Sequence, residues 1–132
     1  MRIREETGSS LVEMALCLPI LLMVLIGTVQ ASLAFYTLNF VSYAARSATR
    51  YACVHSLQSP QPANTTVIRN YVRDMGYPEA KGTTVSTVWP QGNTPGNVVN
   101  VTVQYRFQFT VPLLRLIRPV DIQSTSQMVI LN

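Results

Sequence analysis

The sequence predicts an α+β protein in which one long N-terminal helix, membrane-spanning in its first half, joins a second short helix packed on a three-stranded antiparallel sheet. Three observations predict this class. An apolar run from Leu11 to Val29 continues in helical spacing to about His55. A proline-punctuated linker follows at 59–63. Beyond it, apolar and polar residues alternate strictly from Val99 to Val111, as in a strand with one buried face.

The apolar run is long enough to cross a membrane. From Leu11 to Val29 its only strongly polar side chain is Glu13, and the run with its apolar continuation exceeds the roughly 20 residues that a helix needs to cross the hydrocarbon. A cleaved secretory signal is the competing interpretation. Two features disfavour it, since the run is longer than a usual signal core and the small pair Gly8 and Ser9 precedes it. We therefore expect a spanning helix.

Two residues weaken that helix from within. Pro19 removes one backbone hydrogen bond, and Gly27 loosens the segment further on. A kinked or locally meltable helix follows. Arg2 and Arg4 precede the run, and on the positive-inside rule they favour a cytoplasmic N-terminus with the rest of the chain exported.

The helical pattern continues beyond the apolar run. Aromatic and small residues recur every three or four positions, at Tyr36, Phe40, Tyr43, Ser47 and Tyr51. One helix from about Ser10 to about His55 is the simplest account of this spacing. Because such an aromatic stripe is more often core than ligand site, we expect it to form the centre of the soluble part.

The remaining elements follow the linker. Asn64 or Thr65 can cap a second amphipathic helix, and Gly76 stands in the usual stop position. Thr83 to Trp89 is rich in Thr and Val and predicts a first strand. A turn at 90–97, the strand from Val99, an apolar segment between Pro112 and Pro119, and a last alternating strand from Ile122 to Ile130 complete the sheet.

Composition excludes several functions. The 132 residues are 48% hydrophobic and 12% charged, with a net charge of +4 carried by scattered arginines, so nucleic-acid binding is disfavoured. Cys17 and Cys53 are expected to be free thiols, because one helix would separate them by about 54 Å. His55 has no metal-ligand partners at suitable spacing. No catalytic motif is present, and we expect neither an enzyme nor a cofactor or metal site.

Glu13 needs its own explanation. A charged side chain at bilayer depth costs about 2.5 to 3.5 kcal/mol, so a lone one is by default a functional candidate. If the chain were cut between Gly8 and Ser9, the new α-amino group of one subunit could pair with Glu13 of its neighbour. The alternative is that Glu13 lies at the headgroup level of an uncut anchor and is merely solvated.

These residues resemble a known family. The segment from Gly8 to Met14 is similar to the class III cleavage region of type IV pilin-like proteins, with glycine before the cut and glutamate fifth after it. Its continuation to Pro19, and then Ala44 to Ala52, resembles the TadE-like minor pilins or pseudopilins of the tight-adherence (Tad, Flp) pilus. Less specific similarity extends to Tyr105–Phe107 and Pro112–Leu114. Members usually carry an aromatic residue after the glutamate, where this chain has Met14.

The resemblance implies an organisation and a role. Residues 1–8 would be a leader, 9–35 the transmembrane half of the long helix, and 36–132 an extracytoplasmic, type IV pilin-like domain. A prepilin peptidase would cut after Gly8, and Glu13 would serve assembly at the bacterial inner membrane. The implied partners are other pilin subunits, the peptidase, the assembly platform and membrane lipid. The alternative function is an uncleaved single-pass anchor with a periplasmic partner-binding or adhesin domain.

Overall fold

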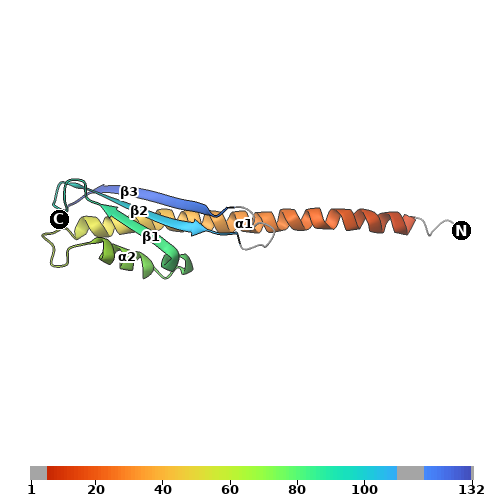
Figure 1. Cartoon of the computed structure of the whole chain (residues 1–132), viewed down its shortest axis with the longest axis horizontal. Helices are drawn as coiled ribbons and strands as arrows, with labels where there is room; N and C mark the ends of the chain where they lie inside the picture. Colours follow the sequence, from red (N-terminus) through yellow and green to blue (C-terminus); the bar gives the residue numbers. More distant parts are fainter. Residues whose placement is uncertain (1–5, 110–117, 132) are drawn as a thin grey trace. The chain divides into compact units, whose positions relative to one another are not determined.

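The computed structural model describes residues 6–109 and 118–131. The chain divides into two compact units, Met1–Leu33 and Ala34–Asn132. Its elements in chain order are α1 (Glu6–Val54), α2 (Thr65–Arg73), the short 3-10 helix η1 (Pro78–Gly82), β1 (Thr83–Val88), β2 (Val98–Phe107) and β3 (Val120–Val129) (Figure 1). This is the predicted α+β layout, with a long helix, a second short helix and a three-stranded antiparallel sheet.

The first unit consists of the first half of α1. Its large apolar side chains from Leu11 to Val29 are all exposed, Ile26 least at 36%. Leu11 and Met14 expose 69% and 73% of their surface. A continuous apolar surface of this kind is unfavourable in water and is normal for a helix in lipid.

The second unit is built on the end of α1, and its core corrects one expectation. The aromatic stripe was predicted to form the centre of the domain, and this is wrong for two of its members: Tyr36 is 45% exposed and Tyr43 is 56% exposed, although Phe40 is buried. The helix face against the sheet is instead a row of small side chains, Ala44, Ala45, Ala48 and Ala52. Small residues let a sheet approach a helix closely at native packing density.

A second helix and η1 lie beside the first strand. Asn64 caps α2, since its side-chain oxygen accepts a hydrogen bond from the Val67 N–H at 2.9 Å, as the sequence predicted. Ile68 and Val72 are the buried residues of this helix. Figure 1 shows β1 between β2 and α2. Gly76, with a φ of +77°, follows the helix in the left-handed region that favours glycine.

The sheet has the order β1-β2-β3 and is antiparallel throughout. Val85 pairs with Val103, and Val103 pairs with Ser124. The alternation predicted for the central strand is confirmed, since Val99, Val101 and Val103 are fully buried. Val111 and the apolar segment from Pro112 lie outside the described residues, apart from Arg118 and Pro119.

Hydrogen bonds join the sheet to the end of α1. The buried Thr49 hydroxyl donates to the carbonyl of Ala45 at 2.7 Å and approaches that of Ser126 on β3 at 3.3 Å. The Leu131 N–H donates to the Cys53 carbonyl at 3.3 Å. These bonds place the last residues of the described chain against the end of α1.

Candidate functional site

The start of α1 holds the residues predicted for cleavage. The helix begins at Glu6, so Gly8 and Ser9 lie in its first turn or just beyond it, and both are exposed. A Cβ added to Gly8 would meet nothing within 4 Å among the described residues, so packing there does not require glycine. A glycine inside a helix costs about 1 kcal/mol relative to alanine. Its effect at this position is to weaken the first turn.

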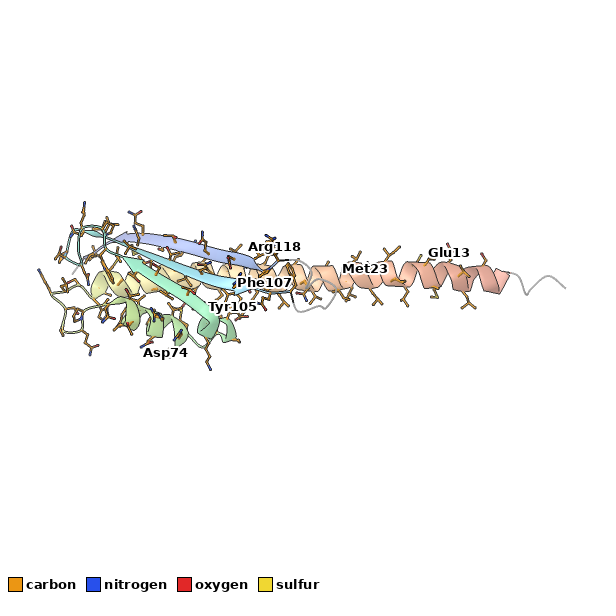
Figure 2. The ribbon with its side chains drawn as sticks, viewed as in Figure 1. Glu13, Met23, Asp74, Tyr105, Phe107 and Arg118 are labelled. Atoms are coloured by element: carbon orange, nitrogen blue, oxygen red, sulfur yellow. The ribbon has the colours of Figure 1, made fainter. Side chains whose placement is uncertain are left out.

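Glu13 lies about one helical turn beyond Ser9, on the same side of α1. Its side chain is exposed and projects from the helix (Figure 2). Within residues 6–109 and 118–131 it makes no ion pair, and the pair found there joins Arg106 to Asp121 at 3.8 Å. No Asp, Glu, Lys or Arg occurs from Met14 to Ala45. Glu13 is therefore a carboxylate without an ion pair among the described residues, at the beginning of a long uncharged stretch of α1.

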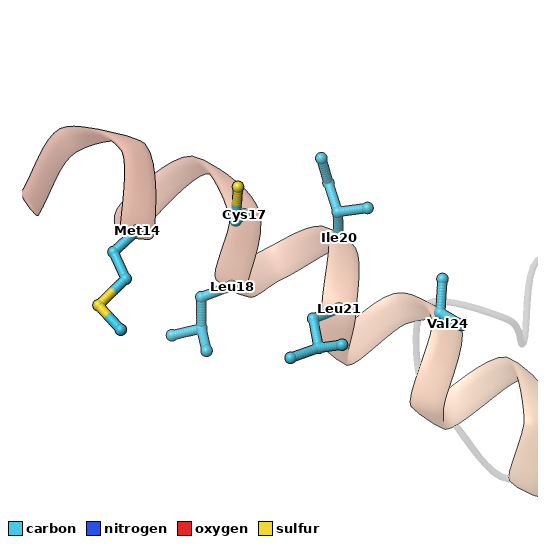
Figure 3. A pocket seen from close by; sticks show the side chains of 6 residues that line it. All are labelled: Met14, Cys17, Leu18, Ile20, Leu21 and Val24. Carbon is cyan, nitrogen blue, oxygen red and sulfur yellow. The ribbon is translucent and has the colours of Figure 1, made fainter. Parts of the chain in front are cut away.

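The helix surface next to Glu13 is apolar. A shallow hollow there is lined by Met14, Cys17, Leu18, Ile20, Leu21 and Val24 (Figure 3). All six residues come from the same stretch of one helix. A small-molecule site normally encloses its ligand between several elements and places a few polar groups at fixed positions. This surface does neither, and its chemistry suits lipid tails or a second apolar helix.

Two predicted weak points lie within the same helix. Pro19 is inside α1, where it cannot donate a backbone hydrogen bond. A Cβ on Gly27 would meet nothing within 4 Å among the described residues. Next to it, the Thr28 hydroxyl donates to the Leu25 carbonyl at 2.8 Å, and the Ser32 hydroxyl donates to the Thr28 carbonyl at 2.9 Å. These hydroxyls satisfy their own hydrogen bonding inside an apolar helix.

The cysteine and the histidine of the second unit, Cys53 and His55, pack within the fold. Cys53 is buried, and this burial raises the pKa of its thiol. His55 stacks on Tyr51 with ring centroids 4.1 Å apart, and its Nδ1 lies 2.9 Å from the Tyr51 carbonyl oxygen. Within the described ranges, no three His, Cys, Asp or Glu side chains are placed to hold a metal ion. Cys17 and Cys53 are free thiols, as expected.

Sequence reasoning missed two buried polar residues that organise the second unit. Thr49 links α1 to β3, as described above. Asn93, in the turn between β1 and β2, is buried and donates from Nδ2 to the Ala63 carbonyl at 3.2 Å. The Leu57 N–H donates to the Asn93 carbonyl at 3.1 Å. Neither residue belongs to a periodic pattern, so its sequence position carried no signal.

α1 is long and apolar enough to cross a membrane, and none of its most apolar window is buried. An exposed apolar helix of this length, followed by an α+β unit, is typical of a membrane-anchored protein. Comparison with family models then finds a match to the family described as TadE-like protein, over residues 8–50. The resemblance predicted from the helix is thereby confirmed for that segment. No curated protein and no solved structure matches the chain.

The match covers 43 of the chain's 132 residues, all of them on α1, and shows what this segment is similar to. TadE-like proteins are a pilus-associated, structural family. The matched segment begins at Gly8, includes Glu13 and ends in the part of α1 that carries the core of the second unit. The N-terminal apolar helix of this chain is thus similar to that of a Tad pilus-associated family of membrane proteins.

Proposed function

We propose that this protein is a minor pilin or pseudopilin that is cleaved after Gly8 by a prepilin peptidase and takes part in assembly or priming of a Tad-type pilus for surface adherence. The observation that carries the proposal is Glu13, a carboxylate without an ion pair among the described residues, on an exposed apolar helix and one turn after the small pair Gly8 and Ser9. The family match supports it, since the match starts at the glycine. In this proposal the N-terminus is cytoplasmic and residues 36–132 are extracytoplasmic.

Cleavage at this position requires a local opening of α1. If the peptidase binds the cleavage segment as an extended peptide, the helical turn around Gly8 unwinds before the bond to Ser9 is cut. Gly8 lowers the helical stability of that turn by about 1 kcal/mol relative to alanine. The first turn of a helix also lacks part of its hydrogen bonding. The predicted bond therefore lies where α1 opens most easily.

After the cut, Ser9 would carry a positive α-amino group close to the apolar run. Glu13 of a neighbouring subunit can neutralise this amine, and the amine can neutralise Glu13. Two charges that are costly next to lipid would then be paired only in the assembled state. Specific partners in this proposal are the major and minor pilins and the assembly platform of the inner membrane.

The N-terminal mass of the full chain tests cleavage. The chain is purified from membranes of cells with and without the prepilin peptidase. We expect a chain that begins at Ser9 in the first case and at Met1 in the second. A chain that still begins at Met1 in the presence of the peptidase would refute processing and favour an uncut anchor with a partner-binding or adhesin domain.

A substitution separates cleavage from assembly. Glu13→Gln keeps the size and hydrogen-bonding shape of the side chain and removes its charge. We expect normal insertion and cleavage but less protein in sheared pili. Val12→Ala, next to Glu13 on α1 and outside the apolar hollow, is the matched control and should leave incorporation unchanged. Equal incorporation of the Glu13→Gln protein would remove the amine-pairing argument.

A further inference from the structure

The aromatic side chains at the base of the second unit have no role in the proposed assembly site. Tyr36 and Tyr43 lie on α1 about two turns apart and are 45% and 56% exposed. The Tyr43 ring lies 6.4 Å from the ring of Tyr77, the residue before η1, and Tyr77 packs on the buried Phe40 at 4.7 Å. Tyr43 thus lies at the edge of an aromatic cluster, and Tyr36 lies two turns before it on the same face of α1.

The position of this cluster along α1 matches a particular depth. The uncharged part of α1 is longer than the roughly 30 Å of a bilayer's hydrocarbon core, so its last one to two turns, with Tyr43, would lie in the headgroup layer and Tyr36 at the edge of the hydrocarbon. From Met14 to Ala45, the whole stretch without a charged residue is about 48 Å long, close to the thickness of about 40–45 Å that includes the headgroups. Arg46 is the first charge after Glu13, and it is exposed.

The chemistry of the side chains fits the same layer. Tyrosine is enriched at membrane interfaces because its ring is apolar and its hydroxyl remains hydrated. Phe35 and Leu38, neighbours of Tyr36, are 66% and 42% exposed. The exposed Lys81 on η1, four residues after Tyr77, can extend its amine to phosphate groups.

We propose that Tyr36, Tyr43 and Tyr77 form an interfacial belt that holds the base of the second unit in the phospholipid headgroup layer. The inference rests on the membrane-spanning part of the proposed function and is independent of cleavage. The belt fixes how far α1 is inserted.

Lipid-depth quenching of tryptophan fluorescence tests the belt. The chain has one tryptophan, Trp89, in the turn after β1. In a Trp89→Phe background, single tryptophans are introduced as Tyr43→Trp, Val54→Trp and Val24→Trp, and the full chain is reconstituted in phosphatidylcholine–phosphatidylglycerol vesicles. One set of vesicles carries a spin label at the headgroup and another carries it deep in the acyl chain. If Trp89→Phe impairs folding, the same substitutions are measured with Trp89 retained, and its emission is subtracted.

We expect headgroup labels to remove most of the emission of the Tyr43→Trp protein and little of that of the Val54→Trp protein. Val54 is a suitable control because it is 50% exposed and lies about 16 Å further along the same helix. Equal quenching at the two positions would overturn the belt. So would a tryptophan at position 43 that is shielded from both the lipid labels and aqueous acrylamide, since that result indicates contact with another subunit.

The Val24→Trp protein separates failure of the tyrosine belt from failure of the membrane-spanning helix. Deep labels that quench this tryptophan establish the span, so that an unquenched tryptophan at position 43 would refute the belt alone. If the deep labels leave the tryptophan at position 24 unquenched, the spanning helix itself is refuted, and the belt with it.

Discussion

Two aromatic residues one turn apart on α1 are predicted to differ strongly in their contribution to stability. Phe40 is 3% exposed and packs on Tyr77, whereas Tyr43 is 56% exposed and reaches only the edge of the same ring cluster. Phe40→Ala removes a fully buried ring and leaves a cavity, which costs about 3–5 kcal/mol. Tyr43→Ala loses mainly one aromatic contact, worth about 0.5–1.5 kcal/mol.

Thermal unfolding of the full chain in detergent micelles, followed by near-ultraviolet circular dichroism, measures this difference. For a unit of this size, each kcal/mol changes the Tm by about 4–8 °C. Phe40→Ala should therefore lower the Tm by at least about 12 °C, and Tyr43→Ala by no more than about half of that. Phe40→Leu is a control that keeps most of the buried volume and should lie between them. Equal losses for the two alanine variants would refute the assignment of the core to one side of the aromatic stripe.

Three further predictions concern the second unit. Asn64→Ala should destabilise it by about 0.5–2 kcal/mol in urea unfolding through loss of the α2 cap, and a change no larger than that of the exposed Asn70→Ala would contradict the role of the cap. Thr49→Val removes the hydroxyl that contacts the carbonyls of Ala45 and Ser126 and should cost about 1–2 kcal/mol by the same assay, against less than about 0.5 kcal/mol for the exposed Thr84→Val. Because burial raises the pKa of Cys53, its thiol should resist iodoacetamide at neutral pH until the unit is unfolded. The unfolded thiol ionises near its ordinary pKa of about 8.5 while the folded one stays protonated, so stability should fall as the pH rises above that value.

Much of the fold follows from periodicity. A membrane-length apolar run, a capped amphipathic segment and a strictly alternating strand each have a physical spacing that leaves few alternatives, and α1, α2 and β2 were predicted for those reasons. The helix face that packs on the sheet was not predicted correctly. The alanines at 44, 45, 48 and 52 bury less apolar surface per residue than the tyrosines do, so the tyrosines dominated the predicted core. The small alanine side chains form the buried face because they allow the strands to approach the helix closely.

The candidate site was predictable for a different reason. Glu13 is evident in the sequence because a carboxylate beside an apolar run is costly, whatever the fold around it. The effect of Gly8 on helix stability could be argued only from the structure. The structure places Gly8 in the first turns of α1, where no described residue would contact an added Cβ. Thr49 and Asn93 act through contacts between elements far apart in the chain. No local pattern could reveal them.

The hydrogen bond from the Leu131 N–H to the Cys53 carbonyl joins the end of the described chain to the end of α1, so the chain after α1 returns to the helix that it left. It leaves the helix at Val54 and returns to the same helical turn, where the Leu131 N–H lies 3.3 Å from the carbonyl oxygen of Cys53. Insertions or exchanges in the intervening loops can therefore change the surface of the unit without altering the length or register of α1. The family match covers residues 8–50 and stops just before this part of the chain. The second unit can in this way change its loops while the end of α1 keeps its bond to Leu131.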